Sequence, residues 1–305
     1  MLIALMSSKK ITLIFFLLLV VISPFFFIGG PNVYSTALFR ALWDCGHILF
    51  FSGLVVVIKP FVKMPEWRFG ILLSIVVFVV GGAIEIIQAH TGRDGNWQDL
   101  LRDLAGTWLG LFWLQKANAL VWAGRLLTLL LLSPSIWTVF LAAIMQWQSA
   151  YYFPVLTDFE HFSDLQRWKG HVEISEEQKT QGKNSLKMFF NTQRYSPVAI
   201  DEYLGDWTNY KFISFDIYNP QEQGIELVFR INDVDHDKGK GLYTDRFNRK
   251  LTIEHGWNHF DIGLDEVQHA PEKRLMNMQE IKRIVFFTSK LQEPKILYLD
   301  NVLLK

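Results

Sequence analysis

The chain has 305 residues, with 30 basic and 30 acidic side chains, and this zero net charge gives no reason to expect a nucleic-acid ligand. Its single cysteine, Cys45, excludes an intramolecular disulfide. Residues 1–150 carry ten basic and six acidic side chains, whereas residues 151–305 carry 20 and 24. We therefore predict two domains, an apolar membrane domain over residues 1–150 and a water-soluble domain over residues 151–305.

Apolar runs in the first half predict a polytopic bundle of about five transmembrane helices. The first run, residues 11–29, is long enough to cross a hydrocarbon core of about 30 Å. A cleaved signal peptide is the alternative for this run, but its length and the absence of a clear small-residue cleavage site favour a retained helix. The other spans are predicted at residues 44–62, 69–89, 99–115 and 126–148.

The distribution of lysine and arginine predicts the orientation of the bundle, because cytoplasmic loops carry an excess of these residues. With the N-terminus in the cytoplasm, only Arg40, Arg93 and Arg102 face outward. An odd number of spans then places residue 150, and the soluble domain after it, outside the cytoplasm. The residues that face inward are Lys9, Lys10, Lys59, Lys63, Arg68, Lys116 and Arg125.

Polar side chains collect where three of the predicted helices meet the outer face of the membrane. Members spaced three or four residues apart share one face of their helix. A charged side chain near the bilayer centre costs about 3 kcal/mol or more, so we interpret these residues as a functional candidate, here called the polar cluster. Its members are Asp44, His47, Glu85, Gln88, Arg93, Asp99 and Asp103.

A structural role is the alternative for the polar cluster. Asp44 and Asp99 would cap the N-termini of their helices. Glu85 would pair with Arg93 or Arg102 to hold the bundle together.

If the chain is an enzyme, the polar cluster would be its catalytic site. Glu85 or Asp99 would act as general base, with His47 as its acid–base partner. Arg93 and Arg102 would clamp a phosphate of a polyprenyl-phosphate-linked glycan. The sequence leaves three classes open: an enzyme, a binding protein and a non-catalytic scaffold for a protein partner.

The first domain resembles the VanZ-like family over about residues 33–115. The resemblance is carried by Asp44-x-x-His47, Glu85-x-x-Gln88, Gly92-Arg93 and Asp99-x-x-x-Asp103-x-x-Gly106-x-x-x-Gly110. The family usually has Lys where this chain has Cys45, and Asn where it has Asp103. Because the family is named for a protein linked to glycopeptide-antibiotic resistance, the resemblance implies a bacterial cell-envelope protein in the cytoplasmic (inner) membrane, with a periplasmic second domain.

From Val155 onward, short β-rich segments bounded by turn residues replace the long apolar runs, which predicts an all-β sandwich. Trp168, Trp207 and Trp257 each adjoin a predicted strand, and we expect them in the core. The predicted strands cover residues 186–190, 212–218, 225–231, 259–262, 284–287 and 296–299.

Several short motifs of residues 155–305 resemble carbohydrate-binding-module jelly rolls, including the related CIA-type jelly roll. They include Asp158-Phe-Glu160, Asp206-Trp207 and Tyr298-Leu-Asp-Asn-Val302. Such jelly rolls often hold a structural Ca²⁺, and hard oxygen ligands suit this ion. The resemblance implies a calcium site at Glu160 and Asp300 with Asn184 or Ser185; the alternative is that the two carboxylates cap strand ends.

A sugar site needs stacking aromatic rings and well-placed polar groups. Candidates cluster around the loop 232–246, for which a solvated acidic loop is the alternative. We expect the bundle to engage a lipid-linked glycan or envelope precursor among membrane lipids, and the jelly roll to bind a glycan or a partner. The candidate ligand-binding residues are Arg230, Asp233, His236, Tyr243, Asp245 and Arg246.

Overall fold

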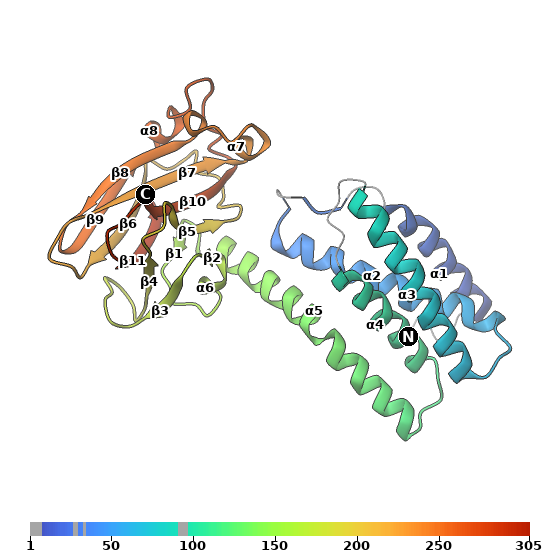
Figure 1. Cartoon of the computed structure of the whole chain (residues 1–305). Helices are drawn as coiled ribbons and strands as arrows, with labels where there is room; N and C mark the ends of the chain where they lie inside the picture. The colour runs from blue at the N-terminus through green and yellow to red at the C-terminus, as the bar shows by residue number, and fades with distance from the viewer. Residues whose placement is uncertain (1–7, 27–29, 33–34, 91–96) are drawn as a thin grey trace. The chain divides into compact units, whose positions relative to one another are not determined.

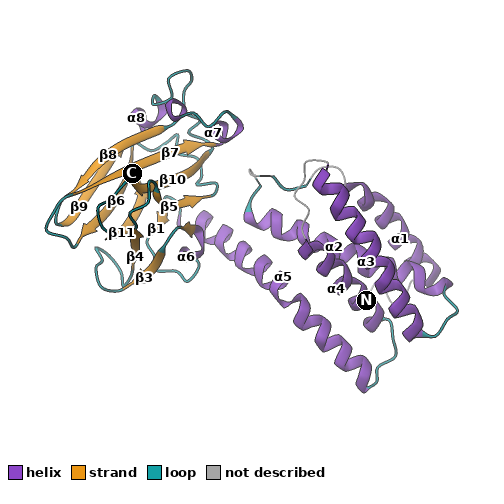
Figure 2. Ribbon diagram, viewed as in Figure 1, coloured by secondary structure: helices purple, strands orange, loops and turns teal. Residues whose placement is uncertain are grey.

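The computed structural model describes residues 8–26, 30–32, 35–90 and 97–305, with side chains omitted for 8–11 and 88–90. The chain divides into two compact units, Met1–Ala142 and Ala143–Lys305. The first unit is helical and the second is built of strands (Figures 1 and 2). The helices are α1 (Ser8–Ile22), η2 (Ser23–Phe26), α2 (Ala37–Ile58), η3 (Lys59–Phe61), α3 (Glu66–His90), α4 (Trp97–Trp113) and α5 (Ala119–Tyr152), which runs into the second unit.

Three helices in the described part of the chain are long and apolar enough to cross a bilayer: Ala37–Phe61, Glu66–Ile87 and Ala119–Tyr152. The first predicted span corresponds to a shorter apolar helix, Thr12–Phe26, and its last residues lie outside the described part. The fourth predicted span corresponds to α4, whose 17 residues include three charged side chains. The count of five spans therefore stays a prediction.

Two glycines of α4 allow it to pack closely against α2. A Cβ added at Gly106 would lie 2.5 Å from the backbone oxygen of Ile48, and one at Gly110 would lie 2.8 Å from that of Ser52. Small residues spaced four apart let helix backbones approach in this way. This close approach brings the side chains that flank the contact, His47 of α2 and Asp103 of α4, into hydrogen-bonding range.

The second unit is a sandwich of two antiparallel sheets, which confirms the predicted all-β class. One sheet has the strand order β3-β4-β11-β6-β9, with β1 also paired to β11, and the other has the order β2-β5-β10-β7-β8. The strands are β1 (Val155–Thr157), β2 (Trp168–Lys169), β3 (Val172–Ser175), β4 (Ser185–Phe190), β5 (Ser196–Asp201), β6 (Phe212–Asn219), β7 (Ile225–Asp233), β8 (Phe247–Ile253), β9 (Gly256–Gly263), β10 (Ile281–Thr288) and β11 (Lys295–Leu304). Short helices join them: α6 (Asp164–Arg167), α7 (Val234–Lys238), η4 (Tyr243–Asp245) and α8 (Leu264–Gln268).

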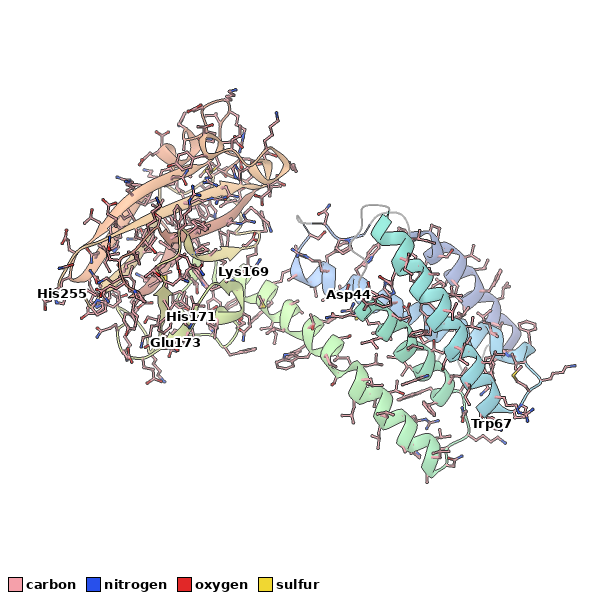
Figure 3. All side chains as sticks on the ribbon, viewed as in Figure 1. Asp44, Trp67, Lys169, His171, Glu173 and His255 are labelled. Carbon is pink, nitrogen blue, oxygen red and sulfur yellow. The ribbon has the colours of Figure 1, made fainter. Side chains whose placement is uncertain are left out.

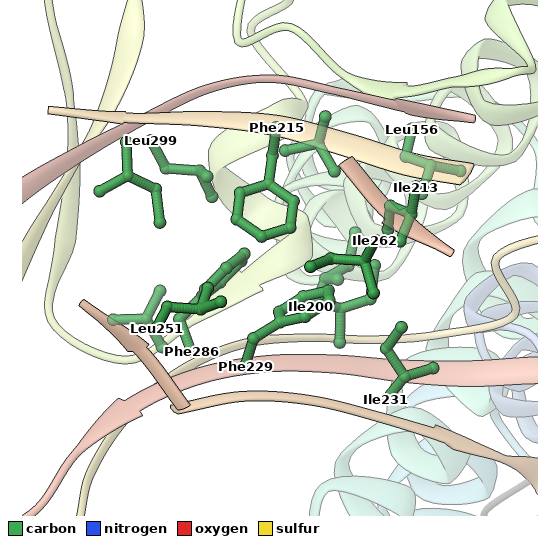
Figure 4. Packing of buried hydrophobic residues seen from close by; sticks show 14 of the residues in the cluster. Leu156, Ile200, Ile213, Phe215, Phe229, Ile231, Leu251, Ile262, Phe286 and Leu299 are labelled. Carbon is green, nitrogen blue, oxygen red and sulfur yellow. The ribbon is translucent and has the colours of Figure 1, made fainter. Parts of the chain in front are cut away.

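The core lies between the two sheets, where inward-facing side chains of both interdigitate (Figure 4). Phe215 of β6 meets Phe229 of β7 and Phe286 of β10, with ring centroids 4.7 and 5.2 Å away, and all three are fully buried. Trp168 and Trp207 are buried as expected, but Trp257 is 37% exposed, so its assignment to the core was wrong. Trp257 follows Gly256 at the start of β9, where its ring packs beside Tyr218 on the outer side of the sheet.

Candidate functional site

Part of the polar cluster converges between α2 and α4. His47 Nδ1 lies 2.8 Å from Asp103 Oδ1, and His47 Nε2 lies 3.9 Å from Asp99 Oδ2. His47 and Asp103 are both buried. α3 closes the group, because a Cβ added at its Gly81 would lie 3.0 Å from Asp103 Oδ2, and its buried Glu85 acts electrostatically on His47. The structure therefore assembles an imidazole and three carboxylates from three helices.

Arg102, which was predicted as part of a phosphate clamp and not as a member of the polar cluster, lies between two of the cluster's carboxylates. Its Nη2 lies 3.1 Å from Asp44 Oδ2, and its Nη1 donates to Asp99 Oδ1. Asp44, labelled on α2 in Figure 3, is therefore held by an ion pair to Arg102 of α4. Its interpretation as an N-cap was wrong, since Thr36 caps α2 by accepting a hydrogen bond from the backbone N–H of Phe39.

The predicted phosphate clamp consists of Arg93 and Arg102, and the structure describes only Arg102. Arg102 is already engaged by two carboxylates, so it does not present an unpaired guanidinium. Arg93 and the side chain of Gln88 lie outside the described residues. What the described side chains of the polar cluster do provide is a buried histidine–carboxylate pair of the kind that can move protons.

One edge of the polar cluster opens on a pocket of about 180 Å³. The ring of Phe26 packs edge-on against the imidazole of His47, with centroids 4.9 Å apart. The histidine of the His47–Asp103 pair therefore borders an apolar space of the helical unit. The pocket is lined by Ile22, Phe25, Phe26, Leu42, Trp43, Gly46 and His47.

In the β-sandwich, the residues of the predicted calcium site hold a turn. Glu160 Oε1 accepts hydrogen bonds from the backbone N–H groups of Lys183 and Asn184, at 2.7 and 2.8 Å. Asp300 Oδ2 accepts from those of Thr180 and Gln181, at 2.7 and 3.2 Å, while burial raises the pKa of this carboxyl. These contacts match the structural alternative, in which the carboxylates cap chain segments.

Further features of this region bear on the metal. The Ser185 hydroxyl is buried without a hydrogen-bond partner, so one predicted oxygen ligand is unused. Asn184, by contrast, points a backbone donor at Glu160. Within the described ranges, no group of three or more His, Cys, Asp or Glu side chains is arranged to hold a metal ion. The donor set therefore fits calcium only in part, and the calcium site stays a prediction.

Half of the predicted sugar-site residues belong to a buried clamp centred on Arg274. This side chain donates to both oxygens of Asp233, at 2.5 and 2.8 Å, and to both of Asp245, at 2.7 and 3.1 Å. His236 Nδ1 lies 3.0 Å from the backbone oxygen of Asp245. Asp233 also caps α7 by accepting from the backbone N–H of His236. Asp233 and His236 are almost completely buried, so they fix the loop and are not available at the surface.

The hydrogen bonds in this clamp lower the pKa values of its two carboxyl groups. Burial alone would raise the pKa of Asp233, but hydrogen bonds from Arg274 and from two backbone N–H groups hold that pKa below its usual value. The hydrogen bond from Arg274 likewise lowers the pKa of Asp245. Arg274 was not predicted as a site residue, because it lies in the loop between α8 and β10, where no pattern in the sequence marks it. Only the fold brings it next to Asp233 and Asp245.

The remaining predicted residues form a surface patch with one addition, Tyr195; the two tyrosines are exposed and the two arginines are half-buried. Arg230 is on β7 between the buried Phe229 and Ile231, so the alternation of a strand turns it to the outer side of its sheet. Its guanidinium donates to Asn232 Oδ1 at 3.2 Å. We call the surface patch of Arg230, Arg246, Tyr195 and Tyr243 the Arg–Tyr face.

The two tyrosines of the Arg–Tyr face offer open ring surface. Tyr195 is 43% exposed and Tyr243 is 65% exposed. The guanidinium of Arg246 lies over the ring of Tyr243, with its carbon 5.2 Å from the centroid. Tyr195 packs against Phe287 of β10, with centroids 4.7 Å apart, which anchors it to the sheet. Exposed rings next to fixed polar groups are the elements that a sugar site requires.

No protein-family model matches this sequence, and no curated protein sequence matches it. Solved structures match the β-sandwich portion. The family 11 carbohydrate-binding module from Clostridium thermocellum is 18% identical, covering 49% of this chain and 93% of its own, with a TM-score of 0.38. The xylan-binding CBM22-1 domain of Paenibacillus barcinonensis Xyn10C is 14% identical, covering 50% and 93%, with a TM-score of 0.35.

An exo-β-agarase is 15% identical with a TM-score of 0.39, and the match covers 50% of this chain but 24% of the agarase. At these identities and TM-scores the similarities carry no argument about ligand or activity. The sandwich architecture stands on its own strand pairings, and the VanZ-like resemblance of the helical unit remains a prediction.

Proposed function

We propose that this chain is an integral protein of the bacterial cytoplasmic membrane whose β-sandwich binds a glycan outside the cytoplasm. The observation that carries the proposal is the Arg–Tyr face, where exposed tyrosine rings flank guanidinium groups fixed by the sheet. Three apolar helices support insertion among membrane lipids. The lysine and arginine bias supports a cytoplasmic N-terminus and an extracytoplasmic second unit.

The rigid base of the Arg–Tyr face supports binding over a purely solvated loop. The Arg274 clamp fixes the loop that carries Tyr243 and Arg246, and Arg230 projects from β7, an interior strand of the five-stranded sheet. Sites held on rigid elements lose little conformational entropy when a ligand binds. A solvated acidic loop, the alternative interpretation of these residues, would have neither the clamp nor the support of the sheet.

The experiment is glycan-array binding of the full chain, reconstituted in nanodiscs of phosphatidylcholine. We expect binding to at least one envelope polysaccharide, and loss of that binding in the double variant Tyr195→Ala, Tyr243→Ala. The matched control is Trp257→Ala, which removes an exposed aromatic ring from the other sheet and should leave binding unchanged. A folded wild-type chain that binds no polysaccharide would remove the proposal, as would equal losses in the control.

A second candidate function is favoured by the His47–Asp103 pair, namely proton transfer in a reaction on a lipid-linked substrate. The pair is buried and borders an apolar pocket, which is the environment in which a histidine acts as acid–base group beside a lipid chain. The test is turnover of a polyprenyl-linked glycan by the reconstituted chain. We expect His47→Gln and Asp103→Asn to abolish turnover and Thr138→Ala, a polar change on α5, to preserve it. Equal turnover in all three variants would leave the pair a packing feature.

A further inference from the structure

The outer side of the five-stranded sheet carries an uneven set of charges. Asp201, at the end of β5, is surrounded by three cations: Arg283 at 2.9 Å, Lys169 at 3.2 Å and Lys282 at 3.6 Å. Asp237 lies 3.6 Å from Arg283. Nearby, Asp233 and Asp245 share one cation, Arg274. Each carboxylate of this region is therefore already paired with a cation of the chain.

Two cations of the same region have no carboxylate. None of the ion pairs within residues 97–305, all of which the structure describes, involves Arg230 or Arg246. The hydrogen-bond partners of Arg230 are Asn232 Oδ1 at 3.2 Å and His236 Nε2 at 3.5 Å, and neither is a carboxylate. The Nε atom of Arg246 is buried and has no hydrogen-bond partner.

The two unpaired guanidinium groups come from neighbouring segments: Arg230 of β7 pairs in register with Asn248 of β8, and Arg246 lies two residues before Asn248, on the same face of the sheet. Burial lowers the pKa of Arg230, and the charge of Arg246 lowers it further. Burial also lowers the pKa of Arg246. A partly desolvated cation without a counter-charge is destabilising, and an anion between two of them would relieve both the repulsion and the unused donor. The Arg–Tyr face is therefore expected to favour a negatively charged ligand.

We propose, on the basis of the glycan-binding function above, that the glycan is acidic and carries carboxylate groups. A carboxylate would lie between Arg230 and Arg246, because the planar guanidinium fork matches the two oxygens of a carboxylate. The exposed rings of Tyr195 and Tyr243 would take the adjoining sugar faces. These rings favour a polysaccharide over an anionic lipid headgroup, which needs only the charges.

The test compares each acidic polysaccharide with its own carboxyl-reduced form, which keeps the chain and removes the charge. The probes are polygalacturonate, alginate and hyaluronate, added to the full chain in phosphatidylcholine nanodiscs, with phosphatidylglycerol vesicles as a separate arm. We expect at least one acidic form to bind about ten-fold tighter or more than its reduced form, as a charged hydrogen bond implies. This preference should shrink as salt is raised, because added ions screen exposed charges.

Three variants locate the effect. Arg230→Gln and Arg246→Gln should each lower affinity for the acidic form about ten-fold and leave that for the reduced form unchanged. The matched control is Arg249→Gln on β8, whose arginine is exposed and paired with Glu266 at 3.0 Å, and it should change neither. If Arg230→Gln fails to fold, Arg246→Gln and the salt series decide the question on their own.

The outcomes separate this inference from the function on which it rests. Equal binding of acidic and reduced forms overturns the acidic preference and leaves the glycan-binding function in place. Binding of no polysaccharide in either form overturns both. Binding of phosphatidylglycerol vesicles, lost in Arg246→Gln, with no polysaccharide bound, would assign the Arg–Tyr face to a lipid surface and overturn both as well.

Discussion

Replacing Arg274 by Met removes the centre of the clamp that holds the loop 233–245. The change leaves Asp233, a fully buried carboxylate, without its ionic partner. Breaking a buried ion pair on one side costs about 3–5 kcal/mol. Because two backbone N–H groups still donate to Asp233, we expect the lower end of that range, about 3 kcal/mol, or roughly a 100-fold rise in the population of the opened loop.

Hydrogen exchange measures this opening locally, without requiring the whole two-unit chain to unfold in one step. The reporters are the backbone N–H groups of His236 and Asn277, which donate to Asp233 at 3.0 and 2.7 Å. At pH 7 both should exchange roughly 100-fold faster in Arg274→Met than in the wild type. Unchanged exchange at these two amides would refute the reasoning, because it would mean that other groups hold the carboxylate.

The effect should depend on pH with a defined sign. In the wild type the pKa of Asp233 is lowered, so its stabilising contribution is present above the unfolded pKa of about 4 and is lost as the pH falls through the lower, folded value. In Arg274→Met we expect burial to dominate and raise this pKa, so the penalty is present at neutral pH and fades as the carboxyl protonates. The difference between the two proteins should therefore narrow toward about pH 4.

Two controls distinguish the clamp from a general loss of charge. Arg249→Met removes an arginine paired with Glu266, but both side chains are exposed, so it should cost less than about 1 kcal/mol. Adding Asp233→Asn to Arg274→Met removes the buried charge as well and should recover part of the loss. No recovery would show that Arg274 acts by packing and not through its charge.

Two further predictions concern the other parts of the chain. Gly106→Ala should lower the melting temperature of the detergent-solubilised chain, because the new Cβ would lie 2.5 Å from the Ile48 backbone oxygen. The control Gly46→Ala should have little effect, because nothing lies within 4 Å of its new Cβ. Equal losses of melting temperature in both variants would contradict the packing argument. Chelation with EDTA should leave the melting temperature of the β-sandwich unchanged, since protein donors hold the turn at residues 180–184; a clear drop would establish the calcium site.

The class of each unit could be predicted because long apolar runs mark the first unit and short β-rich segments between turn residues mark the second. Five strands were nevertheless missed: the short strands β1, β2 and β3, and the longer strands β5 and β8. β5 contains Pro197, which argues against a strand, and β8 contains consecutive basic residues, Arg249 and Lys250, on a half-exposed surface. Trp257 was misplaced for a related reason, since an aromatic residue beside a strand does not reveal which side of the sheet it occupies.

The candidate sites were predictable only as far as helix spacing or a local loop determines them. His47 and Asp103 are 56 positions apart, and their pairing depends on the close glycine contact between α2 and α4. The sequence therefore predicted that both residues belong to one cluster, but not that they pair with each other. Arg274 and Tyr195 were missed entirely. Each reaches its site through strand order, which a single sequence does not determine.

The two candidate sites differ in the sign of their charge, which bears on the expectation that one lipid-linked glycan serves both. Within the described residues, the polar cluster has four carboxylates against one arginine and one histidine, and Arg102 is fully engaged. The described side chains there offer a phosphate no unpaired arginine, whereas the histidine and carboxylates can exchange a proton. The Arg–Tyr face has the opposite bias. An acidic glycan bound by the sandwich is therefore a poor ligand for the described part of the polar cluster, and the buried His47–Asp103 pair is better suited to proton transfer than to holding the same anion.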